Sequence, residues 1–310
     1  MDEGGVAELI ERAGYGPQEP VAVAIRRPGQ EPMVVTRPVE GPGAESMIYI
    51  ASVAKQMTAA CLALLVRRGQ VDTETSARHW LPDLPSWAGA VRLRHLLHHT
   101  AGLPDDARLQ GPGDRTSAGM LTALKSSPAS DSEPGSRFAY SNAGYILLAA
   151  IVERATEQPL PGFARDHLFA PLGMSRTLYW PGPSAQPPGA VPIESPHPAP
   201  LSLGDGGVWS TPADLLRWGD GLNEDRLHIS GLLQTPGFLD DGTPLDYAWG
   251  IGVRVHRGRR VYRHGGGWQQ LRLLHARSPD AGLTLLTVAL RDPADRHIGL
   301  TDDLLDRLLG

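Results

Sequence analysis

Ser52 and Lys55 stand three residues apart at the start of a segment with helical periodicity. Side chains three apart are neighbours on a helix, so the hydroxyl and the amine are expected to face each other. A serine here is also a common N-cap, but a lysine in the first turn opposes the helix dipole. The chain has only one other lysine, Lys125. Because lysine, unlike arginine, can release its proton and act as a base, the pair predicts a nucleophilic serine activated by an amine.

Acyl chemistry also needs a second proton-handling group and donors for a developing oxyanion. The Tyr-Ser-Asn stretch that ends at Asn142 comes just before a predicted helix and offers Tyr140 as that group. Taken alone, Asn142 is a typical N-cap and Tyr140 an ordinary half-buried tyrosine. A His-Gly-Gly-Gly-Trp stretch over residues 264–268 contains glycines that let a backbone approach a ligand closely. A simple glycine turn is the alternative.

The elements that must position these groups form a helical segment between regions rich in strands. Cys61 lies on the apolar stripe of the helix that follows Ser52, which predicts a small core residue. Strands are predicted at both ends of the chain, at residues 21–25, 33–36, 47–50, 250–256, 259–263, 271–276 and 283–290. Helices are predicted at residues 6–13, 91–99, 143–155, 211–222 and 302–309, and a proline-rich connector at 180–200.

This order of elements predicts an α/β fold with a split sheet domain, residues 1–85 and 200–310, and an inserted all-α domain, residues 86–199. The 310 residues suffice for two such lobes. The net charge of −5, from 29 basic and 34 acidic residues, argues against nucleic-acid binding. The single cysteine excludes an internal disulfide and a cysteine-rich metal site.

Acidic residues at the N-terminus and the lack of a long apolar run predict a cytoplasmic protein that does not bind a membrane. His95, His98 and His99 suggest a zinc site at first sight, but adjacent histidines on a helix point in different directions. No dinucleotide or phosphate-loop motif occurs. We therefore expect no cofactor and no metal.

Three motifs in order, Ser-x-x-Lys from Ser52, Tyr-Ser-Asn from Tyr140 and His-Gly-Gly from His264, resemble those of the serine β-lactamase/penicillin-binding-protein superfamily. Tyrosine in the second motif and histidine in the third are similar to its class C β-lactamase-like branch, which includes D-amino-acid peptidases, family VIII esterases and acyltransferases. Residues 96–103, 171–174 and 206–214 match the same branch.

The resemblance implies an antiparallel sheet flanked by helices and assigns roles to the motif residues. Ser52 is the expected nucleophile, and Lys55 and Tyr140 are expected to share its proton. The backbone N–H groups of Ser52 and Gly267 are the expected oxyanion hole. Substrate contacts are implied for the rest of the second and third motifs, namely Asn142, His264, Gly265 and Gly266. We add Trp209 and Trp268 as predicted apolar walls.

Two departures from the family affect specificity. Gln269 and Gln270 stand where relatives often have Pro-Gly, and residues 105–130 form a brief segment that predicts a more open cleft. The resulting hypothesis is a hydrolase that cleaves a small-molecule ester or amide through an acyl-Ser52 intermediate. Acyl transfer to an alcohol or amine uses the same residues and is the alternative. A non-catalytic binding protein on the same scaffold is the third possibility, and the oligomeric state stays open.

Overall fold

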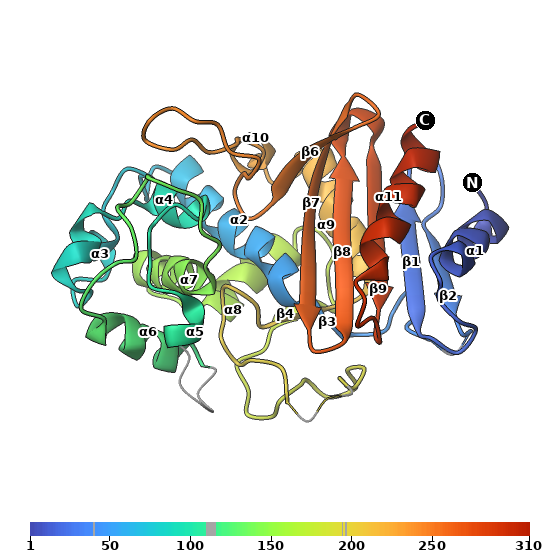
Figure 1. Ribbon diagram of the computed structural model, residues 1–310, viewed down its shortest axis with the longest axis horizontal. Helices are drawn as coiled ribbons and strands as arrows, with labels where there is room; N and C mark the ends of the chain where they lie inside the picture. The colour runs from blue at the N-terminus through green and yellow to red at the C-terminus, as the bar shows by residue number, and fades with distance from the viewer. Residues whose placement is uncertain (40, 110–115, 194, 196) are drawn as a thin grey trace.

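A six-stranded antiparallel sheet forms one half of the computed structural model, which describes residues 1–39, 41–109, 116–193, 195 and 197–310. Its strand order is β2-β1-β9-β8-β7-β6 (Figure 1). The strands are β1 (Val21–Arg26), β2 (Met33–Arg37), β6 (Gly252–His256), β7 (Arg259–Trp268), β8 (Leu271–Ser278) and β9 (Leu283–Ala289). Each was predicted, but β7 is longer than expected. The glycines after His264 lie within this strand instead of leading into the next one.

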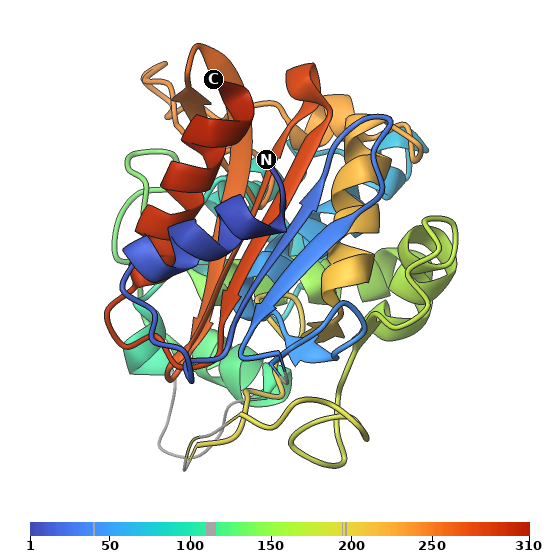
Figure 2. The same cartoon turned by 90° about the vertical axis from the view of Figure 1, so that its right-hand side faces the viewer.

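Helices cover both faces of this sheet, as Figure 2 shows. α1 (Glu3–Arg12) and α11 (Arg296–Leu309) pack on one face, and α9 (Pro212–Asn223) packs on the other. Strand β1 illustrates why: Val21, Val23 and Ile25 point into the core beneath α1 and α11, and the alternating alanines point into the larger core. The sheet therefore separates two hydrophobic cores, and the fold class predicted from the sequence is confirmed.

The helical half lies on the side of α2 (Ala54–Arg67) away from the large sheet (Figure 1). It contains α3 (Ala77–Trp80), α4 (Leu93–Leu97), α5 (Asp106–Leu109), α6 (Ser117–Ser126), α7 (Asn142–Thr156) and α8 (Leu160–Ala164). A small sheet of β3 (Ile48–Tyr49), β5 (Val208–Ser210) and β4 (Leu178–Tyr179) and the short α10 (Ser230–Leu233) complete the elements. Strand β4 lies within the segment predicted as all-helical, so that segment is not helical throughout. The domain division at residues 86–199 stays a prediction.

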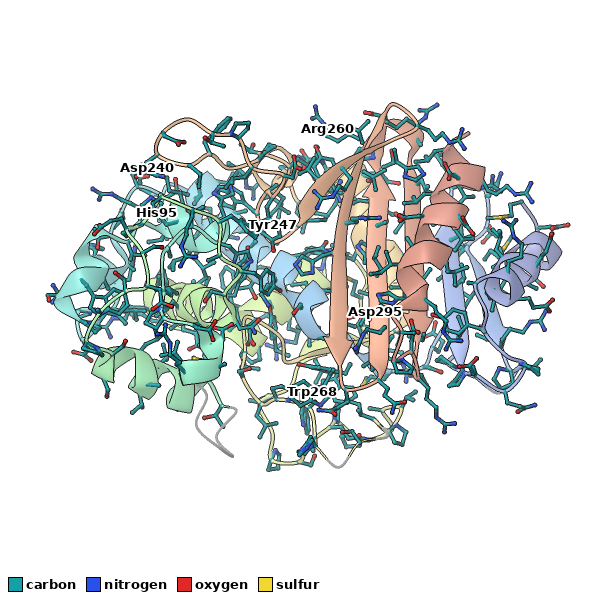
Figure 3. All side chains as sticks on the ribbon, in the orientation of Figure 1. His95, Asp240, Tyr247, Arg260, Trp268 and Asp295 are labelled. Carbon is teal, nitrogen blue, oxygen red and sulfur yellow. The ribbon has the colours of Figure 1, made fainter. Side chains whose placement is uncertain are left out.

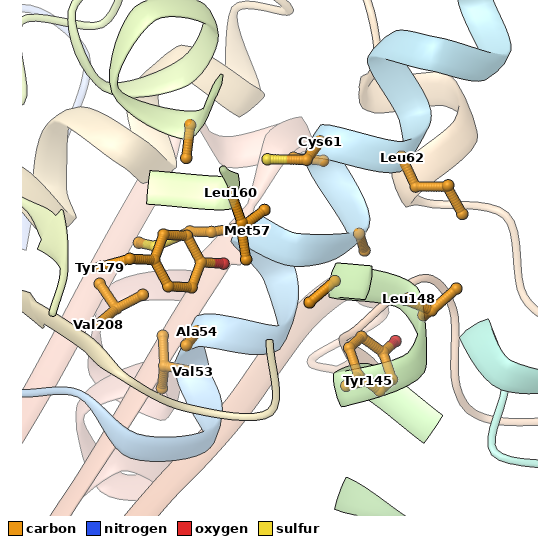
Figure 4. Close-up of a cluster of buried hydrophobic side chains, with 14 of the residues drawn as sticks. Val53, Ala54, Met57, Cys61, Leu62, Tyr145, Leu148, Leu160, Tyr179 and Val208 are labelled. Atoms are coloured by element: carbon orange, nitrogen blue, oxygen red, sulfur yellow. The ribbon is translucent and has the colours of Figure 1, made fainter. Parts of the chain in front are cut away.

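The central helix α2 is buried on all sides from Ala54 to Leu65, although its sequence predicted a polar face. It lies between the sheet and the helical half, so Lys55 is enclosed as completely as the apolar stripe. Figure 4 shows Met57 and Cys61 among side chains of α7, β4 and β5. Burial raises the pKa of Cys61, which is a core residue as predicted. No helix in the described part of the chain has the length and apolar character needed to cross a bilayer.

Candidate active site

Ser52 lies in the 3₁₀ turn η1 (Ala51–Val53), which leads directly into α2. The serine is therefore not an N-cap of α2, the alternative that its position in the sequence left open. Strand β7 packs against this turn at Gly266. A Cβ atom at Gly266 would lie 2.6 Å from the carbonyl oxygen of Ile50, so only glycine permits this approach. The strand that carries the third motif is thus placed beside the serine by its lack of side chains.

Lys55 is fully buried, and its amine makes three polar contacts. Nζ lies 2.7 Å from Oδ1 of Asn142, 2.9 Å from the carbonyl oxygen of Asp205 and 3.3 Å from Oγ of Ser52. The amide and carbonyl oxygens can only accept hydrogen bonds. They occupy two directions of the amine and leave the third for the serine hydroxyl. The predicted Ser–Lys pair is therefore in mutual contact, and Asp205 is a partner that sequence reasoning missed.

Asn142 reaches Lys55 because other residues cap its helix. The hydroxyl of Ser141 accepts from the N–H of Gly144, so Ser141, not Asn142, is the N-cap of α7. The carboxylate of Asp106 accepts from the N–H groups of Asn142 and Ala143, at 2.6 and 3.1 Å. An acidic side chain at a helix N-terminus is favourable. These contacts leave the amide oxygen of Asn142 to Lys55.

Tyr140 lies beside Lys55, with Nζ 4.9 Å from the centroid of its ring. The contact is with the ring face, and no hydrogen bond joins the phenol hydroxyl to the amine. The ring also packs on His99, with 4.3 Å between centroids, and faces His264 at 6.2 Å. Tyr140 is 44% exposed, in contrast to the fully buried Lys55. The structure therefore places the three predicted catalytic side chains together.

His264 belongs to a buried hydrogen-bonded group that sequence reasoning did not find. Its Nε2 lies 3.0 Å from the hydroxyl of Tyr247, and that hydroxyl lies 3.2 Å from Nε2 of His99. Burial, followed by the charge of Lys55, lowers the pKa of His264 to about 4 and that of His99 well below its usual value. His99 stood in the histidine cluster considered for zinc, and no spacing in the sequence pointed to Tyr247.

A cavity of about 90 Å³ opens beside Ser52 and the end of β7. Trp268 is one of its walls, as predicted, and Figure 3 shows this residue at the end of β7. Trp209 does not line this cavity, contrary to the prediction. It is 1% exposed and packs on Tyr49, with 5.4 Å between ring centroids, so it is a core residue. The other lining residues are Tyr49, Ala51, Leu109, Thr116, Met120, Asn142, Ile146, Pro200, Ser202, Asp205, Gly206 and Gly267.

A second, more open cavity of about 520 Å³ lies at the other end of the third motif. His264 and Gly265 line it together with Phe138, Tyr247 and two arginines, Arg254 and Arg263. The third motif therefore faces two spaces, one at Gly267 and one at His264. Gln269 and Gln270 form the two-residue turn between β7 and β8. Of the segment expected to open the cleft, residues 110–115 lie outside the described residues.

The other two histidines of the cluster point away from the site. His98 donates from Nδ1 to the carbonyl of Arg94, and Nε2 of His95 lies 3.6 Å from Asp240. Among the described residues, no three histidine, cysteine or acidic side chains are grouped as a metal site would require.

The fold is that of the serine β-lactamase/penicillin-binding-protein superfamily. The model of the Beta-lactamase family matches residues 19–304, and the chain belongs to this family.

Two curated relatives illustrate the range of the family. The chain is 30% identical over 195 residues to the D-alanyl-D-alanine-carboxypeptidase/endopeptidase AmpH of Escherichia coli, covering 57% of this chain and 49% of the relative. It is 27% identical to a D-aminopeptidase of Gluconobacter oxydans, covering 74% of this chain and 47% of the relative. The chain thus spans about half the length of these relatives.

The similarity in fold extends over nearly the whole chain. The D-amino acid amidase of Ochrobactrum anthropi SV3 superposes with a TM-score of 0.80 at 24% identity, covering 99% of both chains. A D-stereospecific amidohydrolase from Streptomyces gives a TM-score of 0.78 at 21% identity, covering 96% of this chain and 98% of that one.

Proposed function

We propose that the protein is a serine hydrolase that cleaves a small-molecule ester or amide through an acyl-Ser52 intermediate. The observation that carries this proposal is the position of the Lys55 amine, which two obligate acceptors direct toward Oγ of Ser52. Membership of the Beta-lactamase family and the peptidase and amidase names of the relatives also support it. A buried amine beside a hydroxyl is a plausible general base.

In the acylation step, the neutral amine of Lys55 accepts the proton of Ser52 as Oγ attacks the substrate carbonyl. The new C–O bond forms, and negative charge develops on the carbonyl oxygen. The N–H groups of Ser52 and Gly267 are the proposed donors to this oxygen. The bond to the leaving group then breaks, and Tyr140 is the proposed donor of its proton. Water then attacks the acyl ester and gives one proton to the phenolate of Tyr140. The bond between Oγ and the acyl carbon breaks, the acid leaves, and Lys55 returns its proton to Ser52.

Acyl transfer is the second candidate, because the cavity at His264 is separate from the one beside Ser52 and Gly267. An alcohol or amine bound there replaces water as the acceptor in the second step. The residues that form the intermediate are the same, so the two candidates differ only in the fate of the acyl group.

Both candidates are tested by detecting the acyl-Ser52 intermediate. We expect incubation with a p-nitrophenyl ester or a fluorophosphonate to add one acyl or phosphonyl group, seen by intact mass. The adduct should be lost in Ser52→Ala and kept in Ser136→Ala, which removes an exposed serine. A wild-type protein that forms no adduct with any probe would contradict the proposal and favour a binding protein. Added amines and alcohols then divide hydrolysis from transfer through the ratio of the two products.

A further inference from the structure

Both ends of the buried group around Tyr247 have a defined hydrogen-bond direction. The N–H of Ser141 donates to Nδ1 of His99 over 3.1 Å, so this nitrogen carries no proton. At the other end, Nδ1 of His264 lies 2.6 Å from the carbonyl oxygen of Gly265, which can only accept. Nδ1 of His264 therefore carries a proton. The backbone thus assigns opposite roles to the same ring nitrogen in the two histidines.

The middle of the group follows from its ends. A neutral His99 without a proton on Nδ1 has it on Nε2, and donates it to the hydroxyl oxygen of Tyr247 over 3.2 Å. A neutral His264 with its proton on Nδ1 has a bare Nε2, which accepts the phenol hydrogen over 3.0 Å. The hydrogen bonds from Ser141 to Gly265 then all run in a single direction. The phenol of Tyr145 also contacts the Tyr247 hydroxyl, but its own hydrogen is donated to the carbonyl of Leu97 over 2.8 Å.

The surroundings favour the neutral form of both rings. His99 and His264 are buried, and each faces the amine of Lys55. The other titratable groups nearby are His98 and the phenols of Tyr140 and Tyr145, and Asp246, Arg254 and Arg263 line the cavity that His264 faces. A proton on Nε2 of His264 would set two donors against the Tyr247 oxygen. The phenol hydrogen would then lose His264 as its acceptor, which disfavours this protonation state.

We propose that Tyr247 is a positioning residue that fixes His99 and His264 as opposite neutral tautomers. The hydrogen bonds of this group join three segments that are distant in the sequence, namely the end of α4, the loop before β6 and strand β7. In Figure 3, Tyr247 lies between the sheet and the helical half. Because the Tyr140 ring packs on His99 at 4.3 Å, fixing His99 at both nitrogens also places Tyr140 beside Lys55. The catalytic part of this inference rests on the proposed function.

This assignment changes the role expected for His264. Both of its ring nitrogens are occupied, one by Tyr247 and the other by the carbonyl of Gly265. The imidazole therefore offers a substrate neither a positive charge nor a free N–H group. Among the side chains of the three motifs, Lys55 is then the one that becomes a cation, when it accepts the proton of Ser52.

The first test reads the tautomers directly in the wild-type protein. Long-range ¹H–¹⁵N spectra of histidine-labelled protein at pH 7 should show His99 protonated on Nε2 and His264 protonated on Nδ1. The variants His99→Gln and His264→Gln assign the signals. Finding either ring as an imidazolium, or both rings as the same tautomer, would overturn the proposal. This result does not depend on turnover, so it is separate from the acyl-adduct test.

The second test is Tyr247→Phe, which keeps the aromatic ring next to Phe138, 5.7 Å away, and removes the hydroxyl. We expect kcat for a p-nitrophenyl ester to fall about tenfold as Tyr140 loses its fixed position. The acid limb of the pH profile should move to higher pH, since His264 loses the donor that stabilises its neutral form. The control Tyr262→Phe removes a buried hydroxyl of β7 that does not belong to the hydrogen-bonded group around Tyr247. Unchanged kcat, acid limb and tautomers in Tyr247→Phe would refute the positioning role.

Discussion

The amine of Lys55 lies over the ring face of Tyr140, 4.9 Å from its centroid, and a second ring, that of Tyr145, lies 5.7 Å away. The negative face of an aromatic ring attracts an ammonium group. Since Lys55 is fully buried and Tyr140 is 44% exposed, the phenol ring lies between the amine and solvent. The two ring faces therefore lie next to the amine together with the oxygens of Asn142 and Asp205.

Replacing Lys55 by arginine should nearly abolish turnover although the positive charge is kept. A guanidinium cannot accept the Ser52 proton and does not fit between the oxygens of Asn142 and Asp205. Loss of a general base corresponds to about 10²–10⁴ in kcat, which steady-state ester hydrolysis measures. Lys125→Arg, at an exposed lysine paired with Asp83, is the control. Near-normal turnover in Lys55→Arg would mean that the lysine acts only through its charge.

Gly266→Ala and Gly265→Ala should differ sharply in stability although the two positions are adjacent. The new Cβ at Gly266 meets the carbonyl of Ile50 at 2.6 Å and the side chain of Leu273 at 2.9 Å. At Gly265 the nearest atom is 3.7 Å away. Overpacking of this kind costs about 1–3 kcal/mol, so urea unfolding should show a lower midpoint for Gly266→Ala only. Equal midpoints would mean that β7 does not pack tightly on the turn of Ser52.

Asp106→Ala should lower both stability and activity, because its carboxylate caps the helix that carries Asn142. Loss of an N-terminal cap costs about 1 kcal/mol, and fraying of the first turn moves Asn142 away from Lys55. Unfolding and ester hydrolysis are both measured. Asp105→Ala, which removes an exposed carboxylate bonded to the N–H of Ala107, should change activity little. If the two variants behave alike, the cap does not position the site.

The free energy of unfolding should fall as the pH drops from about 6.5 to 4. Burial lowers the pKa of His264 and of His275 from 6.5 to about 4 in the folded protein, aided by the charges of Lys55 and Arg277 respectively. The unfolded chain therefore binds these protons first, and protonation favours unfolding. Each histidine costs on the order of 3 kcal/mol of stability by pH 4. Urea titrations at several pH values measure the slope.

The variant His275→Asn should flatten this slope, whereas His228→Asn, at an exposed histidine, should leave it unchanged. A slope that is the same in wild type and His275→Asn would show that His275 is not neutral in the folded state.

Replacing the two tryptophans that we predicted as cavity walls should affect different properties, namely stability for Trp209 and selectivity for Trp268. Trp209→Ala removes a core side chain and should cost about 3–5 kcal/mol in unfolding free energy. Trp268→Ala should instead change kcat/KM among esters with different acyl groups, because Trp268 lines the cavity beside Ser52. Stability and ester selectivity are measured for both variants. A selectivity change confined to Trp209→Ala would reverse these assignments.

Local patterns in the sequence were sufficient for the strands of the large sheet, for the longer helices α2, α7 and α9, and for the centre of the site, but not for α3, α5, α6, α8, α10, β4 and β5. The period of apolar residues predicted α2, the alternation after Tyr247 predicted the late strands, and Thr211 caps α9 as expected. Ser52 and Lys55 are close in sequence, so their spacing alone indicated that they meet.

Other parts of the site depend on contacts between distant segments. His99 and Tyr247 are 148 positions apart and meet only because the loop before β6 packs on the end of α4. Trp209 was assigned wrongly because an apolar residue next to a family motif looks the same whether it faces a cavity or the core. The hydrogen bonds of Lys55 to Asn142 and Asp205 were also not predicted, since the periodicity of one helix does not reveal what packs around it.

Strand β1 is hydrogen-bonded to β2 on one side and to β9 on the other, although β9 is far from β1 in the sequence and is synthesised much later. Only the β1–β2 hairpin can form while the middle of the chain is being synthesised. The serine and the lysine are synthesised well before β7, and β7 is connected to β1 only through β8 and β9, which follow it. The proposed nucleophile is therefore synthesised long before the strand that completes its site.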